Sequence, residues 1–286
     1  MSVSVKSLLS ALTSRGPHRV LRGNLAIAGQ PGVVYTPESG RNLPAVAFGH
    51  GWLTSAGHYR GLLEHLASWG IVAAAPDTER GPIPSHLGLA TDLLTTLDIC
   101  TGVRLGDGAI SVDPERLALA GHDMGAGAAV IAAGQRPVAT VASLFPAPTA
   151  PAAEGLAPGL DMPALILAGA TDLGSIRSNA IPMATTWSGP ALLRALDKAS
   201  HNGIIEGRRL LTAVGAGKHE LRTARLTRAL LAGYLLATLN DDKTYRPFAD
   251  PQATIPHTAV VDPTAPREEQ PQKLKTVGRM VTLLRR

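Results

Sequence analysis

Apolar residues occur in two kinds of pattern along the chain. Residues 20–51 contain short apolar runs broken by Pro- and Gly-containing clusters, which predicts a β-meander. Further along, short apolar runs alternate with longer segments of helical spacing. The expected strands are 43–48, 71–75, 116–120, 138–144, 164–168 and 192–196, and the expected helices are 59–69, 89–100, 124–134, 176–187 and 220–238. This alternation predicts an α/β fold with a mostly parallel sheet and helices on both faces.

The pattern divides the chain into four parts. An N-terminal segment, 1–19, precedes one α/β domain over 20–240. Six prolines lie within 247–271, so we expect 241–272 to be an extended strap without regular secondary structure. The last part, 273–286, has apolar residues at helical spacing between basic residues, which predicts a basic amphipathic tail.

Charge is concentrated in that tail. The chain has 27 Lys and Arg against 22 Asp and Glu, a net charge of +5. Residues 273–286 hold five Lys or Arg and no acid, so the rest of the chain is neutral overall. A neutral body does not predict a nucleic-acid surface, which needs cations gathered on one face of the fold. The tail is expected to dock on its own domain, on a second copy of the chain, or on a membrane surface.

Composition excludes several classes of protein. Hydrophobic residues make up 45% of the chain and charged residues 17%, values typical of a globular protein. The single cysteine, Cys100, excludes an intramolecular disulfide and a cysteine-based metal cluster. No run of 18 apolar residues predicts a membrane span, and Ser residues interrupt the N-terminal apolar runs. We therefore expect a cytoplasmic protein.

The segment Gly121-His122-Asp123-Met124-Gly125 follows an expected strand and precedes an Ala/Gly-rich helix. This is the G-x-S-x-G nucleophile-elbow pattern with Asp in place of Ser. The turn is so tight that larger residues at the two glycines would collide with neighbouring backbone. The side chain at its apex, Asp123, is expected to stand above the sheet at a helix N-terminus, where an anion is favoured.

Around this elbow the chain resembles the α/β-hydrolases of the dienelactone hydrolase, cutinase-like polyester hydrolase and platelet-activating-factor acetylhydrolase group. The resemblance spans about 17–240 and rests on motifs in a characteristic order. They are GHGW at 49–52, LASWGIVAAAPDT at 66–78, DPERLALAGHDMG at 113–125, PALILAGATD at 163–172 and LDKASHNG at 196–203. The gap between Phe145 and Asp161 has no room for an inserted cap domain.

The resemblance implies a role for each residue that matches a family motif. Asp123 takes the nucleophile position, Asp172 that of the triad acid and His201 that of the general base, in the chain order of this fold. The backbone N–H groups of Trp52 and Met124 match the oxyanion-hole donors. The residues expected near the substrate are His50, Trp52 and Trp187. His122 is expected to be packed rather than catalytic, and no metal or cofactor is implied.

Aspartate at the apex leaves three functions open. The first is a hydrolase in which Asp123 acts on a small ester, lactone, epoxide or halide. Haloalkane dehalogenases and epoxide hydrolases of this fold use an Asp elbow to attack a saturated carbon. The second is an inactive relative that binds a ligand or partner, because two carboxylates favour a charged imidazole, which is a poor base. The third is a serine carboxylesterase whose nucleophile is replaced by Asp in this chain.

Overall fold

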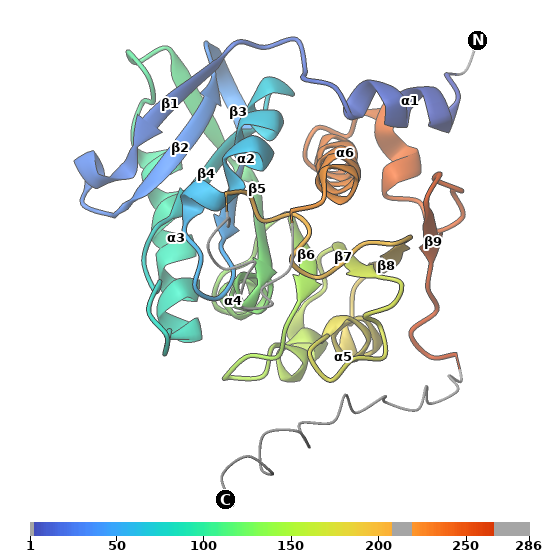
Figure 1. Cartoon of the computed structure of the whole chain (residues 1–286). Helices are drawn as coiled ribbons and strands as arrows, with labels where there is room; N and C mark the ends of the chain where they lie inside the picture. The colour runs from blue at the N-terminus through green and yellow to red at the C-terminus, as the bar shows by residue number, and fades with distance from the viewer. Residues whose placement is uncertain (1–2, 208–218, 266–286) are drawn as a thin grey trace, which may run out of the picture.

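A computed structural model describes residues 3–207 and 219–265 and contains one nine-stranded sheet (Figure 1). Its strand order is β1-β2-β4-β3-β5-β6-β7-β8-β9. The strands β3 to β8 run parallel, while β1, β2 and β9 are antiparallel additions at the two edges. The strands are β1 Val20–Asn24, β2 Gly32–Pro37, β3 Gly40–Gly49, β4 Val72–Pro76, β5 Ile110–Asp123, β6 Thr140–Pro146, β7 Ala164–Gly169, β8 Ala191–Leu196 and β9 Thr258–Val260.

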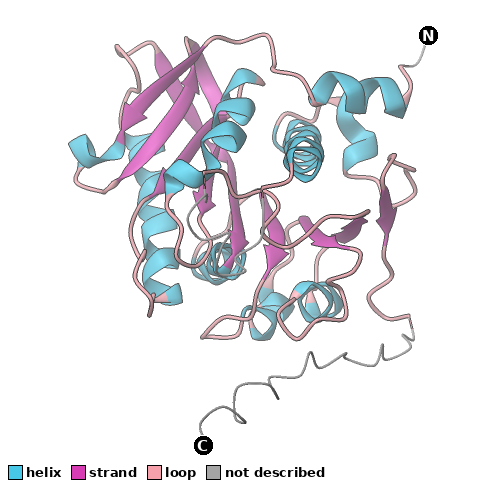
Figure 2. Cartoon of the chain, viewed as in Figure 1, coloured by secondary structure: helices cyan, strands magenta, loops and turns pink. Residues whose placement is uncertain are grey.

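Helices cover both faces of this sheet (Figure 2). Apolar side chains of α1, α2 and α6 pack in one core layer, and those of α3, α4 and α5 pack in a second layer on the opposite face. The helices are α1 Val5–Leu12, α2 Arg60–Ser68, α3 His86–Gly102, α4 Met124–Gln135, α5 Ala180–Thr186 and α6 Leu221–Leu239. The prediction of an α/β-hydrolase fold is confirmed.

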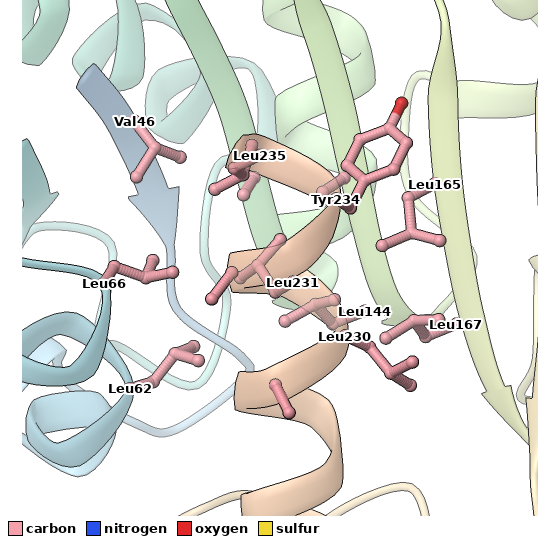
Figure 3. Close-up of a cluster of buried hydrophobic side chains, with 14 of the residues drawn as sticks. Val46, Leu62, Leu66, Leu144, Leu165, Leu167, Leu230, Leu231, Tyr234 and Leu235 are labelled. Carbon is pink, nitrogen blue, oxygen red and sulfur yellow. The ribbon is translucent and has the colours of Figure 1, made fainter. Parts of the chain in front are cut away.

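Helix α6 forms the centre of the first core layer. It lays Leu230, Leu231, Tyr234 and Leu235 against leucines of β6 and β7 and against Val46 of β3 (Figure 3). The Tyr234 hydroxyl is hydrogen-bonded to Thr140 Oγ1 at 2.7 Å, so its polar atom is satisfied inside the core. This packing fixes the sheet whose carboxyl edge carries the candidate site.

Most expected elements are present, but the meander over 20–51 is wrong. β1 and β2 form a hairpin, while β4 and not β3 pairs with β2. β3 instead enters the centre of the sheet between β4 and β5. Its central residues, 45–48, are fully buried and apolar, as expected of a strand covered on both faces.

The regions outside the expected domain contain regular structure. Helix α1 lies within 1–19 and buries Leu8, Leu9 and Leu12 in the first core layer. Within the strap, a 3-10 helix spans Lys243–Phe248, and β9 extends the sheet by pairing with β8. The expectation of no regular structure over 247–271 is therefore wrong at β9. The tail, 273–286, lies outside the described residues.

No cap is inserted between β6 and β7, as predicted. The connecting residues contain only two short 3-10 helices, Ala153–Gly155 and Ala157–Gly159. Within the described ranges no helix is both long and apolar enough to span a membrane.

Candidate active site

The nucleophile elbow joins β5 to α4. Asp123 is the last residue of the strand and has φ = 57° and ψ = −122°, a strained conformation for a residue other than glycine. A Cβ atom at Gly121 would overlap the Gly125 carbonyl, and one at Gly125 would overlap the Gly49 carbonyl. The close approach of β3, β5 and α4 therefore requires these glycines and holds the strained turn.

Both oxygens of the Asp123 carboxylate have a partner. Oδ1 lies 3.1 Å from His201 Nε2, and Oδ2 accepts a hydrogen bond of 2.8 Å from the Trp52 backbone N–H. Because a carboxylate oxygen can only accept, His201 Nε2 must carry a hydrogen in this arrangement. In this geometry the His201 ring therefore donates a hydrogen bond to the Asp123 carboxylate.

The pKa of Asp123 reflects these contacts. Burial by itself raises the pKa of this carboxyl. The His201 hydrogen bond, electrostatic interactions with His122 and His201, and the Trp52 N–H together outweigh burial and lower the pKa to about 2. Asp123 is thus ionised at neutral pH and can serve as a nucleophile without a base.

One of the expected oxyanion donors is already occupied. The Trp52 N–H is donated to Asp123 Oδ2, so the carboxylate places its own oxygen where the oxyanion of a serine hydrolase would bind. Met124 begins α4, and the Asp123 side chain makes no capping hydrogen bond to that helix. A substrate carbonyl oxygen would have to displace Oδ2 to reach the Trp52 N–H.

Asp172 follows β7 near His201, but no hydrogen bond between the described residues joins its carboxylate to the His201 ring. Its Oδ2 is buried and has no hydrogen-bond partner within residues 3–207 and 219–265. Burial raises the pKa of Asp172, Glu220 adds to this effect, and the charge and backbone N–H of His201 oppose it. The structure thus brings the expected base, His201, to the expected nucleophile, Asp123, but shows no hydrogen bond from the His201 ring to the expected acid, Asp172.

We expect replacing Asp172 with asparagine to stabilise the protein at neutral pH. A carboxyl whose folded-state pKa is raised stabilises the fold below its unfolded pKa, and this contribution is lost as the pH rises through the folded pKa. The melting temperature of Asp172→Asn should exceed that of the parent at pH 7, and the two should converge near pH 3. The exposed Asp107→Asn serves as the control. A neutral-pH melting temperature of Asp172→Asn at or below that of the parent would contradict the assigned burial cost.

The three residues expected near the substrate lie in different places. His50 is fully buried, and its ring nitrogens lie 2.9 Å and 2.7 Å from the carbonyl oxygens of Gly51 and Thr78, so it shapes the loop instead of facing a ligand. The Trp52 side chain is 50% exposed, and its indole N–H is donated to the Pro82 carbonyl. Of the three, only Trp52 has a largely exposed side chain among the described residues.

Trp187 does not reach the site, and its assignment as a substrate contact is wrong. Its side chain is buried in the second core layer, and its indole N–H is donated to the Met162 carbonyl. Met162 precedes β7, whereas Asp172 follows it, so the two residues lie at opposite ends of this strand. The side chain was assigned by residue type alone, and no local pattern tells a core indole from a pocket indole.

Tyr59 is a site residue that the sequence did not reveal. Its hydroxyl accepts a hydrogen bond from the Gly51 N–H at 3.0 Å and lies 2.8 Å from His122 Nδ1. No family motif contains Tyr59, and it lies 63 residues before its partner, His122. His122 is fully buried, in keeping with its expected packed role. Among the described residues no cluster of three or more His, Cys, Asp or Glu is arranged to hold a metal ion.

Comparison with protein families gave one finding for this chain. A family model described as PETase, PET hydrolase-like, matches residues 4–206. The match includes the elbow, Asp172 and His201, and extends over most of the chain. Comparison with curated proteins gave no match.

Proposed function

Because the chain belongs to the PET hydrolase-like family of α/β-hydrolases, we propose that it is a hydrolase whose nucleophile is the Asp123 carboxylate and whose target is a saturated carbon. The observation that carries this proposal is the hydrogen bond from the Trp52 N–H to Asp123 Oδ2. With Oδ2 held there, Oδ1 is the oxygen that attacks. A carbonyl substrate gains no oxyanion site, whereas a saturated carbon needs none.

The reaction has two steps. In the first, Asp123 Oδ1 forms a bond to the substrate carbon while the bond from that carbon to the leaving group breaks, giving an alkyl ester on the enzyme. In the second, water attacks Cγ of Asp123, and its proton passes to His201 Nε2. Oδ2 carries the negative charge of the tetrahedral intermediate and already lies at the Trp52 N–H. Breakage of the Cγ–Oδ1 bond, with transfer of the second water proton to the departing oxygen, releases the alcohol and restores the carboxylate beside protonated His201.

The resting contact between Asp123 and His201 favours an epoxide over a halide. Opening an epoxide creates an alkoxide that needs a proton, and an imidazolium His201 next to Oδ1 can donate it. That transfer leaves His201 neutral, and it is then the base that the second step needs. A halide leaving group takes no proton from His201. The Trp52 indole N–H is donated to the Pro82 carbonyl and not to a leaving group.

The experiment that tests this proposal is trapping of the ester in His201→Gln. Without the base, the second step stops, so the variant should accumulate a covalent adduct on Asp123 with 1-bromobutane, whose leaving group takes no proton. With styrene oxide the adduct should form more slowly, because the alkoxide must then take its proton from water. Mass spectrometry of the elbow peptide measures it. The exposed His18→Gln should turn over like the parent. Absence of an adduct on Asp123 with both probes would overturn the proposal.

A second candidate, a non-catalytic ligand-binding relative, is favoured by one observation. Both Asp123 oxygens are satisfied in the resting structure, and Asp172 makes no hydrogen bond to the His201 ring, so Asp123 and His201 can form a stable ion pair. In that case neither His201→Gln nor the parent would form an adduct. Binding of a carboxylate or ester ligand without turnover would then support this second candidate.

A further inference from the structure

A chain of hydrogen bonds connects the two loops that contact Asp123. It starts at the Gly51 N–H, one residue before Trp52, and reaches the Tyr59 hydroxyl at 3.0 Å. From there it continues to His122 Nδ1 at 2.8 Å. The other ring nitrogen, His122 Nε2, lies 2.8 Å from the His201 carbonyl oxygen. The chain therefore runs from the loop of the oxyanion donor to the backbone of the base.

The direction of each bond follows from the chemistry of its ends. A carbonyl oxygen only accepts, so His122 Nε2 must carry a hydrogen. The Gly51 N–H only donates, so the Tyr59 hydroxyl accepts that bond and can donate its own hydrogen to His122 Nδ1. Each group in the chain can thus donate in the same direction, from Gly51 to His201.

Packing holds the chain in place. Tyr59 and His122 are both fully buried. The His122 ring centroid lies 5.6 Å from that of Tyr59, 6.0 Å from that of Phe145 and 5.3 Å from that of His201. Rings enclosed at these distances have little freedom to rotate. A displacement of one loop is therefore transmitted to the other.

We propose that Tyr59 and His122 are positioning residues that hold the Trp52 N–H and the His201 ring on opposite oxygens of Asp123. Neither side chain is assigned contact with the substrate. The catalytic effect of this positioning rests on the proposed function, because both reaction steps need Asp123 Oδ2 at the Trp52 N–H and the His201 ring at Asp123 Oδ1. A misplacement on the order of 1 Å can cost about 100-fold in rate.

The test compares His122→Gln with His122→Leu in the full chain. Glutamine keeps a donor for the His201 carbonyl and an acceptor for Tyr59, whereas leucine keeps neither. Both remove the direct electrostatic effect of His122 on Asp123, so a difference between them reports positioning alone. The readout is the pKa of Asp123, measured by carboxyl ¹³C NMR. This pKa should stay well below its ordinary value in His122→Gln. It should rise in His122→Leu, because misplaced His201 and Trp52 groups no longer offset the effect of burial, which raises the pKa.

A second pair of variants covers the case in which His122→Leu does not fold. Tyr59→Phe removes only the hydroxyl of the chain, and Tyr245→Phe is the matched control on the 3-10 helix after α6. The pKa of Asp123 should rise in Tyr59→Phe and stay unchanged in Tyr245→Phe. Equal pKa values in the two His122 variants, or no change in Tyr59→Phe, would overturn the positioning role.

The lifetime of the ester on Asp123 adds a catalytic readout. With styrene oxide, the ester should last about 100-fold longer in His122→Leu than in the parent, and His122→Gln should restore most of the hydrolysis rate. Equally slow hydrolysis in both variants would count against the proposal. If the parent forms no ester, the proposed function fails, while the NMR comparison still decides the role of His122.

Discussion

Asp123→Asn should reduce turnover of an epoxide by about 10⁴-fold or more, the scale found when a hydrolytic enzyme loses a residue of its catalytic triad. The amide nitrogen and oxygen are poor nucleophiles, while the side-chain shape is conserved. The measurement is the steady-state rate with styrene oxide, with intact mass confirming that the amide has not hydrolysed back to aspartate. Unchanged turnover in the intact Asn variant would show that another group reacts.

Asp123→Ser gives the complementary result. Serine has a single side-chain oxygen, and when this Oγ faces His201 no second oxygen is left for the Trp52 N–H. That N–H can then bind a substrate carbonyl. We expect this variant to lose epoxide turnover and gain hydrolysis of p-nitrophenyl acetate. Ester hydrolysis by the parent that survives in Asp123→Asn would contradict the account, because it would not depend on the carboxylate.

The second large effect is on folding. Gly121→Ala should destabilise the protein by about 3 kcal/mol, the upper part of the usual range for overpacking, because the new methyl overlaps the Gly125 carbonyl and backbone has little room to move. Chemical denaturation measures the loss. Refolded Gly121→Ala should also lose activity, since the elbow must open to admit the methyl group.

A glycine of α4, the helix that packs against Gly121, provides the control for that loss. Gly134 lies near the C-terminal end of α4, and a methyl group added there would meet no atom within 4 Å. Gly134→Ala should therefore stabilise the protein by about 0.5–1 kcal/mol through helix propensity. Equal effects of the two substitutions would show that the contact between β5 and α4 is not as tight as the structure has it.

The fold was largely predictable because its signals are local. Buried parallel strands and amphipathic helices each repeat over several residues, and the elbow motif fixes the junction of β5 and α4. The pairing of β2 with β4 was not predictable in this way, since it depends on which strands meet in space. The short strand β9 was hidden among prolines, because its bonds to β8 come from residues far along the chain.

The site was predictable only where a motif marks it. Asp123 and His201 were assigned from the resemblance to family motifs, one at the end of β5 and the other after β8, and the structure brings them within 3.1 Å. The occupation of the Trp52 N–H by Asp123 Oδ2 was not evident, because it depends on the strained backbone of the elbow and on a loop 71 residues away. Tyr59 and His122 were missed as a pair for the same reason: no sequence period links them.

The most direct test of the central claim is a single turnover of an epoxide in oxygen-18 water with enzyme in excess. If water attacks Cγ of Asp123, the heavy oxygen enters the Asp123 carboxylate, and the diol carries an ordinary oxygen from the enzyme. Mass spectrometry of the elbow peptide and of the diol measures both. The account predicts label on Asp123 and none in the first-turnover diol, and label in the diol with none on Asp123 would contradict it.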